Sequence, residues 1–357
     1  MTEPRPRATD LGVEIGIRPP GPHNSITDVP EVSVGHVTLV DGDGPLNIGH
    51  GPVRTGVTAI LPHQDNVFER KITASAHVVN GFGKAVGFLQ VGELGVIESP
   101  IVLTSTLSTW RAADALINYL SERSPGVYSF NPVVGECNDG FLNDIIGRHI
   151  RSEHVLGAIS GARSPSTDEG NVGAGTGMTG FGWKGGIGTA SRLCEVAGGQ
   201  HTVGVMTLTN TGDSREFRID GVRIGRRLLP PDDEFDPTGG AGSIIMVVAT
   251  NAPVSSRQVG RIGRRAALGL ARAGGIADHH SGDFIIAFTN AREGRGLGDA
   301  DLTPLMRGAI EATEEAVINS VLRAETMVGR DGNTRHGIPI DGVREILSAR
   351  GPSTSSS

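Results

Sequence analysis

The residues with the clearest chemical potential lie at the step from Gly242 to Ser243. A run of small residues, Gly-Gly-Ala-Gly, ends at this serine, and six apolar residues, Ile244 to Ala249, follow it. The apolar run predicts a buried strand rich in β-branched residues, and the glycines before it can adopt backbone conformations that other residues disfavour. This junction suits a chain that cuts itself between Gly242 and Ser243. A turn before a strand is the ordinary alternative.

Such a cut would generate its own base. The Ser243 hydroxyl would attack the carbonyl carbon of Gly242 to form an ester, and water would then hydrolyse that ester. Ser243 would become a new N-terminal residue, and an α-amine has a reference pKa of about 7.7–8.0. A hydroxyl beside its own N-terminal amine is an established form of activated nucleophile. Ser243 is therefore our candidate nucleophile.

The segment His279-His280-Ser281-Gly282-Asp283 offers a second group of polar side chains. Residues two apart on a strand share a face, so Asp283 could orient the Ser281 hydroxyl. The adjacent histidines would point apart, and no helix of the HExxH type surrounds them, so we expect no metal site. A polar turn before a strand is the alternative to the Ser281–Asp283 relay.

Two further segments carry groups that could bind a substrate. Pro132–Asp144 reads as a Gly-punctuated loop before a short helix, in which Glu136 and Asn138 could bind a substrate amine. Asn210 closes an apolar strand, and its amide could donate to an oxyanion. Ordinary turn chemistry is the alternative in both segments.

The glycine-rich stretch Gly170–Gly188 formally contains a dinucleotide fingerprint, Gly175-x-Gly177-x-x-Gly180. A fingerprint should follow a buried strand and open a helix. Here the residues upstream are polar, glycines continue downstream, and no Gly-Lys-Ser/Thr follows. We expect neither a nucleotide nor any other cofactor, and favour a backbone that packs closely around a site.

The composition excludes several other classes of protein. Glycine provides 53 of 357 residues, about twice the usual ~7%, which predicts many tight turns. The aromatic content of 4% and net charge of −7 argue against a nucleic-acid partner. Two cysteines, Cys137 and Cys194, do not make a disulfide framework or a zinc site. We expect a cytoplasmic protein without membrane contact, because no stretch has signal-peptide or membrane-helix length.

The order of elements favours an α+β layered fold with mixed or largely antiparallel sheets, because several strands follow one another without a helical crossover. The expected strands are Glu31–Val40, Thr55–Leu61, Pro100–Thr104, His154–Ser160, Thr202–Asn210, Phe217–Ile224, Ser243–Thr250 and Asp283–Asn290. The expected helices are Thr109–Arg123, Ser256–Ala273 with Ser255 or Ser256 as N-cap, Thr303–Thr326, and a short one capped by Asp341 that runs through Leu347.

The chain is expected to form a single domain over residues 1–357. Residues 226–242 read as an exposed linker before the cut, because Arg226–Thr238 is polar and proline-rich. Residues 351–357 read as a disordered tail.

Taken together, these segments resemble the β-peptidyl aminopeptidases and the L-aminopeptidase/D-esterase-amidase enzymes, which are self-processing N-terminal-nucleophile hydrolases. The likeness covers nearly the whole chain. It rests on Ile26-Thr-Asp-Val-Pro with Val34-Gly-His, Arg54–Ile60, Asn80-Gly-Phe-Gly-Lys84 with Gln90-Val-Gly-Glu, Pro132–Asp144, Gly173–Gly177, Lys184–Arg192 and Gly242-Ser-Ile-Ile.

The resemblance implies a four-layer α-β-β-α sandwich that is cut into an α chain, residues 1–242, and a β chain, residues 243–357. It implies assembly into a larger homo-oligomer, commonly a tetramer of such heterodimers. It assigns Ser243 as nucleophile, Ser281 and Asp283 as the serine–acid pair, Asn210 as oxyanion donor, and Glu136 as the partner of the substrate amine.

Phe141 departs from the resemblance, which leads us to expect a tyrosine there in several relatives, with a hydroxyl that could donate to the oxyanion. One such donor can be worth about 10²–10³-fold in rate. Either Asn210 and a backbone N–H suffice, or the substrate range is altered.

The function we expect is removal of N-terminal residues (β-amino, D- or L-amino acids) from short peptides, amides and esters through an acyl-enzyme on Ser243. An acyl or acetyl transferase of the same fold is the near alternative. The acetyltransferases of this fold use a threonine nucleophile, so Ser243 favours the hydrolase. A non-catalytic binding protein that is never cut is the alternative of a different class.

Overall fold

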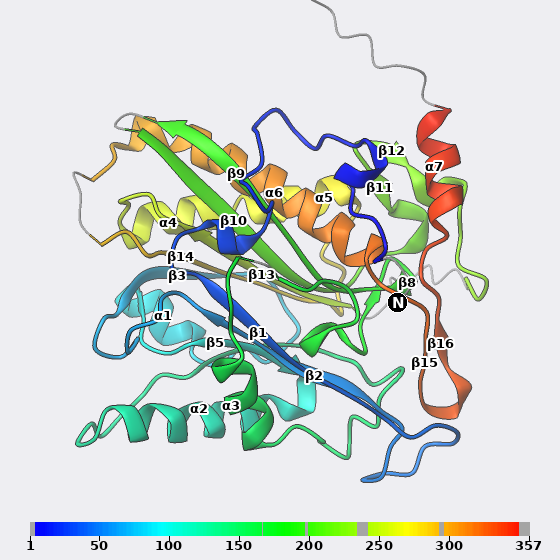
Figure 1. The fold of residues 1–357 in the computed structure, drawn as a ribbon, viewed down its shortest axis with the longest axis horizontal. Coiled ribbons are helices and arrows are strands. Elements are labelled where there is room, and N and C mark those ends of the chain that lie inside the picture. Colours follow the sequence, from blue (N-terminus) through cyan, green and yellow to red (C-terminus); the bar gives the residue numbers. More distant parts are fainter. Residues whose placement is uncertain (1–3, 166, 197–198, 234–241, 293–295, 350–357) are drawn as a thin grey trace, which may run out of the picture.

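The computed structural model describes residues 4–165, 167–196, 199–233, 242–292 and 296–349. Two β-sheets lie face to face in it, and helices cover their outer faces, which gives four layers (Figure 1). The predicted tail 351–357 and linker residues 234–241 lie outside the described ranges. Both sheets are mixed, so the expected α+β sandwich with mixed sheets is confirmed.

The smaller sheet has four strands in the order β1-β2-β5-β6. These are β1 (Ser33–Asp41), β2 (Val53–Leu61), β5 (Ile101–Ser105) and β6 (Val133–Cys137). The larger sheet has six strands in the order β4-β3-β14-β13-β10-β9. These are β4 (Val96–Ile97), β3 (Ile72–Gly81), β14 (Gly282–Thr289), β13 (Ser243–Thr250), β10 (Gly199–Asn210) and β9 (Gly186–Val196).

The helices form the two outer layers. The smaller sheet is covered by α2 (Thr109–Arg123) and α3 (Ser152–Ser160), and the larger sheet by α4 (Ser256–Gly263), α5 (Ala266–Ala273) and α6 (Leu302–Leu322) (Figure 1). The remaining elements are peripheral: α1 (Phe88–Leu94), α7 (Ile340–Ser348), and the strand pairs β7 (Thr179–Gly180) with β8 (Trp183–Lys184), β11 (Arg218–Ile219) with β12 (Val222–Arg223), and β15 (Met327–Val328) with β16 (Thr334–Arg335).

Strand β13 is buried on both faces because it lies in the middle of the larger sheet. Ile245 and Val247 pack into the core between the two sheets. Ile244 and Met246 pack into the core beneath the outer helices. This explains why the strand reads as a continuous apolar run instead of an alternating one.

Two of the predicted elements have the observed bounds, namely β13 and α2. The strand predicted at His154–Ser160 is wrong, since these residues belong to helix α3. Its buried residues Val155, Ala158 and Ile159 have helical spacing and pack against the smaller sheet. A short apolar run is compatible with both periods, which is why periodicity alone misassigned it.

Other predictions need smaller corrections. The helix expected at Ser256–Ala273 is two helices, α4 and α5, although Ser255 is the N-cap as predicted. Phe217–Ile224 holds a two-stranded hairpin instead of one strand. Pro132–Asp144 begins with the buried strand β6 and continues in turns without the expected short helix.

Candidate active site

Three strand ends converge at Ser243. It is the first residue of β13, and it lies opposite Asn210, the last residue of antiparallel strand β10. On its other side it lies opposite Gly282, the first residue of parallel strand β14. Sheet register alone therefore brings together residues from distant parts of the sequence.

The Asn210 side chain presents its amide donor to the serine. Its Nδ2 lies 3.4 Å from Ser243 Oγ and donates to the backbone carbonyl of Asn138 at 3.1 Å. Its Oδ1 accepts from the Thr179 N–H at 2.8 Å. These partners fix the amide in one orientation, with its NH₂ group directed at the nucleophile.

The pair Ser281 and Asp283 is fully buried beside this strand end. Ser281 Oγ donates to Asp283 Oδ1 at 2.7 Å and lies 3.4 Å from Thr211 Oγ1. Burial raises the pKa of the Asp283 carboxyl to about 6; the Ser281 hydrogen bond lowers it, and the nearby Asp278 carboxylate raises it. Asp283 Oδ2 has no hydrogen-bond partner within the described ranges. The pair thus holds a proton site whose pKa is raised to about 6.

The peptide bond before Ser243 is held on two sides. The Gly242 carbonyl accepts a hydrogen bond from the Gly282 N–H at 3.1 Å. A Cβ atom at Gly242 would lie 2.9 Å from Thr211 Oγ1 and 3.1 Å from Thr211 Cα. Close approach to Thr211, which follows Asn210, therefore requires glycine at position 242.

Glu136 and Asn138, the candidate partners of a substrate amine, occupy different positions. Glu136 lies on β6 and is only 3% exposed; one carboxylate oxygen accepts from the Lys84 N–H at 2.8 Å and the other from the Thr106 hydroxyl. Asn138 is exposed, and its side-chain oxygen accepts from the Gly140 N–H at 2.9 Å. Asn138 meets Asn210 through its backbone carbonyl instead.

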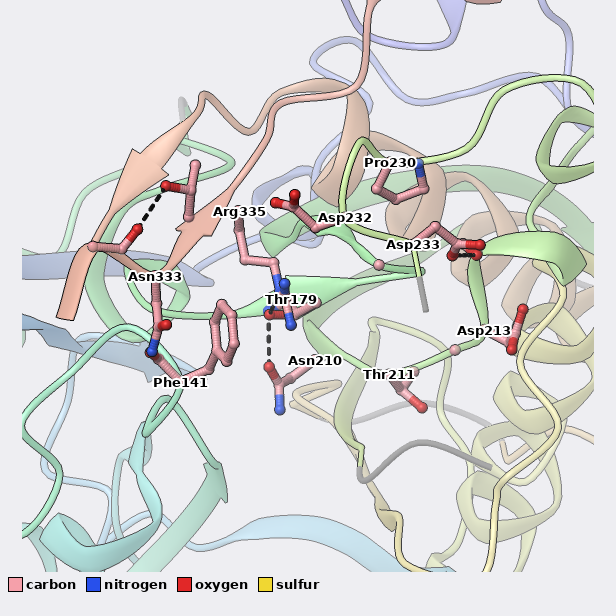
Figure 2. A pocket seen from close by; sticks show the side chains of 15 residues that line it. Phe141, Thr179, Asn210, Thr211, Asp213, Pro230, Asp232, Asp233, Asn333 and Arg335 are labelled. Atoms are coloured by element: carbon pink, nitrogen blue, oxygen red, sulfur yellow. Dashed lines mark hydrogen bonds between the residues drawn. The ribbon is translucent and has the colours of Figure 1, made fainter. Parts of the chain in front are cut away.

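A cavity of about 570 Å³ opens beside Asn210 (Figure 2). Phe141, Thr179, Asn210, Thr211 and Arg335 form part of its wall. Ser243, which is 5% exposed, does not line the cavity, and neither do Ser281, Asp283 or Glu136. Asn210 and Thr211 are therefore the residues that connect the cavity to the buried catalytic candidates.

The described part of the predicted linker borders this cavity. Pro230, Asp232 and Asp233 contribute to its wall. Asp233 forms an ion pair with Arg215 at 2.7 Å. In the uncut chain, these described linker residues thus lie against the cavity beside Asn210.

Phe141 is 38% exposed in the cavity wall, where its ring lies beneath the Arg335 guanidinium, with 3.6 Å between Arg335 Cζ and the ring centroid. The structure therefore pairs Phe141, at the position where the resemblance leads us to expect a tyrosine in relatives, with a cation.

Sequence reasoning missed several residues around the site. Thr179 and Arg335 lie on short strands without a strong pattern, and Thr211 follows a residue that was singled out. Asn80 donates through Nδ2 to the carbonyls of Asp278 and Ser281, at 2.8 and 2.5 Å, and so shapes the loop before β14. The Asn80-Gly-Phe-Gly motif was the available signal.

Sequence reasoning also gave no sign that Cys137 and Lys184 are buried ionisable residues with shifted pKa values. Burial raises the pKa of the Cys137 thiol well above its ordinary value, while a hydrogen bond with Ser243 lowers it. Burial lowers the pKa of Lys184 to about 7, and Asp139 opposes this. Lys184 Nζ donates to the Gly175 and Gly185 carbonyls at 3.0 and 2.7 Å, which ties the glycine-rich stretch together. That stretch therefore positions backbone around the site.

Within the described ranges, no three His, Cys, Asp or Glu side chains gather as a set of metal ligands. Every helix in those ranges is too short or too polar to cross a lipid bilayer.

The fold and the site define a class: a serine aminopeptidase of the N-terminal-nucleophile type. Within that class, the chain belongs to peptidase family S58, whose sequence model matches residues 24–335. The sequence is 39% identical over 366 residues to the β-peptidyl aminopeptidase BapA of Sphingosinicella microcystinivorans, which covers 96% of this chain and 92% of that protein.

Solved structures with the same overall fold are also similar in sequence to this chain. The PH0078 protein from Pyrococcus horikoshii OT3 is 46% identical, with a TM-score of 0.91 over 97% of this chain and 100% of that one. The L-aminopeptidase D-Ala-esterase/amidase from Ochrobactrum anthropi is 33% identical, with a TM-score of 0.87 over 97% of this chain and 99% of that one. The latter is described as a prototype for the serine aminopeptidases and a variant of the Ntn hydrolase fold.

Proposed function

We propose that this chain cuts itself between Gly242 and Ser243 and then uses Ser243 to release N-terminal residues from short peptides, amides and esters. One observation supports this most strongly: Ser243 begins a buried central strand with the Asn210 amide 3.4 Å from its hydroxyl. Three further features lie near this strand end: the cavity beside Asn210, the Gly282 N–H, and the buried Ser281–Asp283 pair.

The self-cleavage step begins with attack of Ser243 Oγ on the carbonyl carbon of Gly242. The C–N bond breaks, the serine nitrogen takes up the hydroxyl proton, and an ester joins the two residues. The Gly282 N–H already donates to that carbonyl, so it can stabilise the oxyanion that forms. Water then hydrolyses the ester, which leaves a Gly242 carboxylate and a free Ser243 hydroxyl and amine.

Turnover repeats this chemistry on a substrate. The Ser243 α-amine removes the hydroxyl proton as Oγ attacks the substrate carbonyl, and the proton passes to the leaving amine or alcohol. Asn210 donates to the oxyanion, and the Ser281–Asp283 pair tunes the proton network at the strand end. Water attacks the acyl-enzyme and frees the N-terminal residue. Apart from water, these steps use the protein's own groups.

Glu136 is proposed to receive the ammonium group of the substrate. Each of its carboxylate oxygens already accepts one hydrogen bond, from the Lys84 N–H and the Thr106 hydroxyl. A carboxylate oxygen has two acceptor positions, so both can accept a further donor. The two existing bonds hold the carboxylate in place.

The range of substrates and the state of the protein belong to the same proposal. Relatives are named for β-peptidyl and for L-amino acid and D-Ala substrates, so we propose that this site accepts β-, D- or L-residues. The two chains are proposed to remain together and to assemble into a tetramer of heterodimers. A cytoplasmic location is proposed because Cys137 and Cys194 are both unpaired and buried.

Denaturing electrophoresis tests the cut and the nucleophile together. Purified wild-type protein is expected to give two fragments that together account for 37.1 kDa. Ser243→Ala lacks the attacking hydroxyl, so it is expected to stay whole and to show no aminopeptidase activity. The substrate for the activity assay is a β-alanyl or D-alanyl p-nitroanilide.

Ser121→Ala serves as the matched control. Ser121 is an exposed serine on α2, and its hydroxyl donates to the Asn118 backbone carbonyl of the same helix. It should be cut and active like the wild type. A Ser243→Ala protein that still divides at this position, or that still turns over substrate, would show that Ser243 is not the nucleophile.

A further inference from the structure

Arg335 projects into the cavity beside the proposed nucleophile from strand β16 (Figure 2). Its guanidinium carbon lies 3.6 Å from the centroid of the Phe141 ring, and its Nε donates to Thr179 Oγ1 at 3.1 Å. The ring supports one face of the guanidinium and the threonine holds one edge. The plane and direction of the cation are therefore set before any ligand binds.

The outer edge of the guanidinium remains available. Neither terminal nitrogen of Arg335 has a hydrogen-bond partner in the part of the chain that the structure describes. Arg335 is one of the residues that line the cavity, and Figure 2 shows its side chain extending among the other lining residues. Burial lowers the pKa of the Arg335 guanidinium, and the Asp232 carboxylate opposes this. The cation is thus partly stripped of water yet still charged, since arginine does not lose its proton in proteins.

The acidic residues of the cavity have partners of their own. Asp233 is paired with Arg215 at 2.7 Å, and Asp213 accepts from the Arg215 N–H at 2.7 Å. Asp232 lies 3.7 Å from His336 Nε2. Arg335 is therefore not committed to a carboxylate of the cavity wall by a close ion pair.

A short chain of contacts links Arg335 to the reacting serine. Thr179 accepts from Arg335 through its hydroxyl and donates to Asn210 Oδ1 through its N–H. The Asn210 amide lies 3.4 Å from Ser243 Oγ. The guanidinium thus stands in the same cavity as the proposed oxyanion donor, with two side chains between it and the nucleophile.

We propose that Arg335 binds the free C-terminal carboxylate of a short peptide substrate, on the leaving-group side of the cut bond. This rests on the proposed function. The two free terminal nitrogens form a planar fork that matches a carboxylate in a bidentate arrangement. A leaving residue with its carboxylate fits within about 570 Å³ beside Asn210, so dipeptides are the substrates favoured by this arrangement.

Three substrates that share one acyl residue test this: β-alanyl-leucine, its C-terminal amide, and β-alanyl p-nitroanilide. The quantity measured is the ratio of kcat/KM for the free acid to kcat/KM for the amide. Arg335→Met is expected to lower that ratio about 10- to 100-fold, mainly through KM, which corresponds to one charge-assisted hydrogen-bonded pair. Arg335→Lys keeps the charge without the fork and is expected to give an intermediate ratio.

A second measurement needs no variant. If Arg335 binds the carboxylate, free leucine inhibits the wild-type enzyme competitively and more strongly than leucinamide does.

Arg344→Met is the control variant for the ratio of kcat/KM values, because Arg344 is an exposed arginine on α7. Its ratio should equal that of the wild type.

Two results would overturn the assignment. One is an Arg335→Met ratio equal to the wild-type ratio, including the case in which all three substrates lose activity together, since that marks a structural role through Thr179. The other is inhibition by leucinamide that equals inhibition by leucine. Wild-type protein that hydrolyses none of the three substrates would instead contradict the proposed function itself.

Discussion

At the scale of single residues, Asp283 combines burial with a functional position. Its carboxyl is fully buried, accepts from Ser281, and has a pKa raised to about 6, mainly by burial. The ordinary pKa of this carboxyl is 3.8, so the folded protein keeps the Asp283 proton up to a higher pH than the unfolded chain does. Ionisation near pH 6 therefore switches the charge next to the strand end that carries Ser243.

This predicts the pH dependence of kcat/KM. Activity of the processed enzyme should rise through a step near pH 6, as Asp283 loses its proton, and through a second step near the α-amine pKa of about 7.7–8.0. Asp283→Asn still accepts from Ser281 but cannot ionise. It should lose the lower step, keep the upper one, and be about 10²-fold slower at pH 7.5, at the low end of acid–base effects because Asp283 acts through Ser281.

The exposed residue Asp341 on α7 provides the comparison for that profile. Asp341→Asn should retain both steps. A lower step that persists unchanged in processed Asp283→Asn would assign it to another group and remove Asp283 from the proton network.

At the scale of elements, close backbone contacts position the strands. Helix α6 runs directly against β9, and a Cβ atom at Gly188 would lie 1.9 Å from the Ala316 carbonyl oxygen and 2.7 Å from the Ser320 nitrogen. Strand β9 pairs with β10, which carries Asn210 at its end. The spacing between helix and sheet thus depends on a glycine remote from the nucleophile.

Substitution of that glycine should cost stability. Gly188→Ala forces backbone apart in a close-packed layer, so we expect a loss of about 2–4 kcal/mol and a Tm lower by about 3–5 °C. Thermal unfolding followed by circular dichroism measures this. Gly92→Ala is the control: Gly92 lies within helix α1, and its Cβ would meet nothing within 4 Å. Alanine favours helix, so its Tm should be equal or slightly higher. Equal values for both variants would contradict the packing argument.

The same elements show how far sequence reasoning reaches. A long amphipathic pattern predicted α2, and a continuous apolar run predicted β13. Periodicity failed at α3, where nine residues are too few to separate the two periods, and where packing against the smaller sheet decided the outcome. The four-layer arrangement itself came from family resemblance.

The candidate site, too, could be predicted from local sequence patterns only in part. The step from Gly242 to Ser243 could be singled out from local pattern, and strand register then explains why Asn210 and Gly282 flank it. Arg335 could not be predicted, because it reaches the cavity only after β16 packs beside Phe141 and Thr179. Contacts between segments so far apart in the sequence leave no periodic signal.

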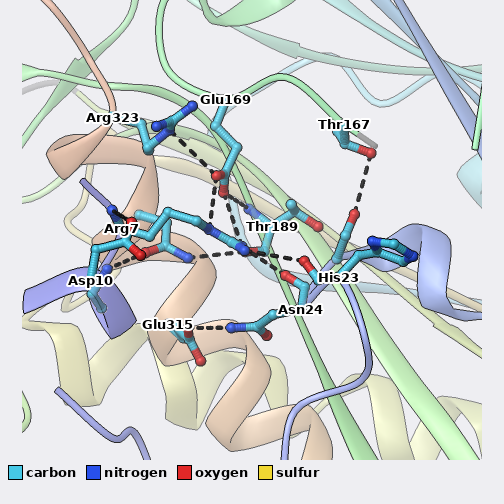
Figure 3. A network of polar contacts seen from close by, with 12 residues as sticks. Arg7, Asp10, His23, Asn24, Thr167, Glu169, Thr189, Glu315 and Arg323 are labelled. Atoms are coloured by element: carbon cyan, nitrogen blue, oxygen red, sulfur yellow. Dashed lines mark hydrogen bonds and ion pairs between the residues drawn. The ribbon is translucent and has the colours of Figure 1, made fainter. Parts of the chain in front are cut away.

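At the scale of the whole molecule, the two proposed chains are interlaced. Strands β13 and β14 from residues 243–357 lie between β3 and β10 from residues 1–242 in one sheet. A polar network adds to this: Glu169 pairs with Arg7 at 3.0 Å and with Arg323 of the proposed second chain at 3.6 Å (Figure 3). Arg192 likewise pairs with Glu315 on α6 at 2.7 Å.

Cleavage should therefore leave the architecture intact. The fragments are expected to elute as one species in gel filtration, also in 1 M salt, because salt screens the outer charges but not the buried apolar core. They should separate only in denaturant. Two species in native buffer would show that the shared sheet does not hold the chains together.

The most direct test of the central claim is N-terminal sequencing of active, purified protein. The account predicts two sequences in equal amounts, one from the start of the chain and one that opens Ser-Ile-Ile-Met at Ser243. Fully active protein that yields only the first sequence would contradict the claim that this enzyme creates its nucleophile by cutting its own chain.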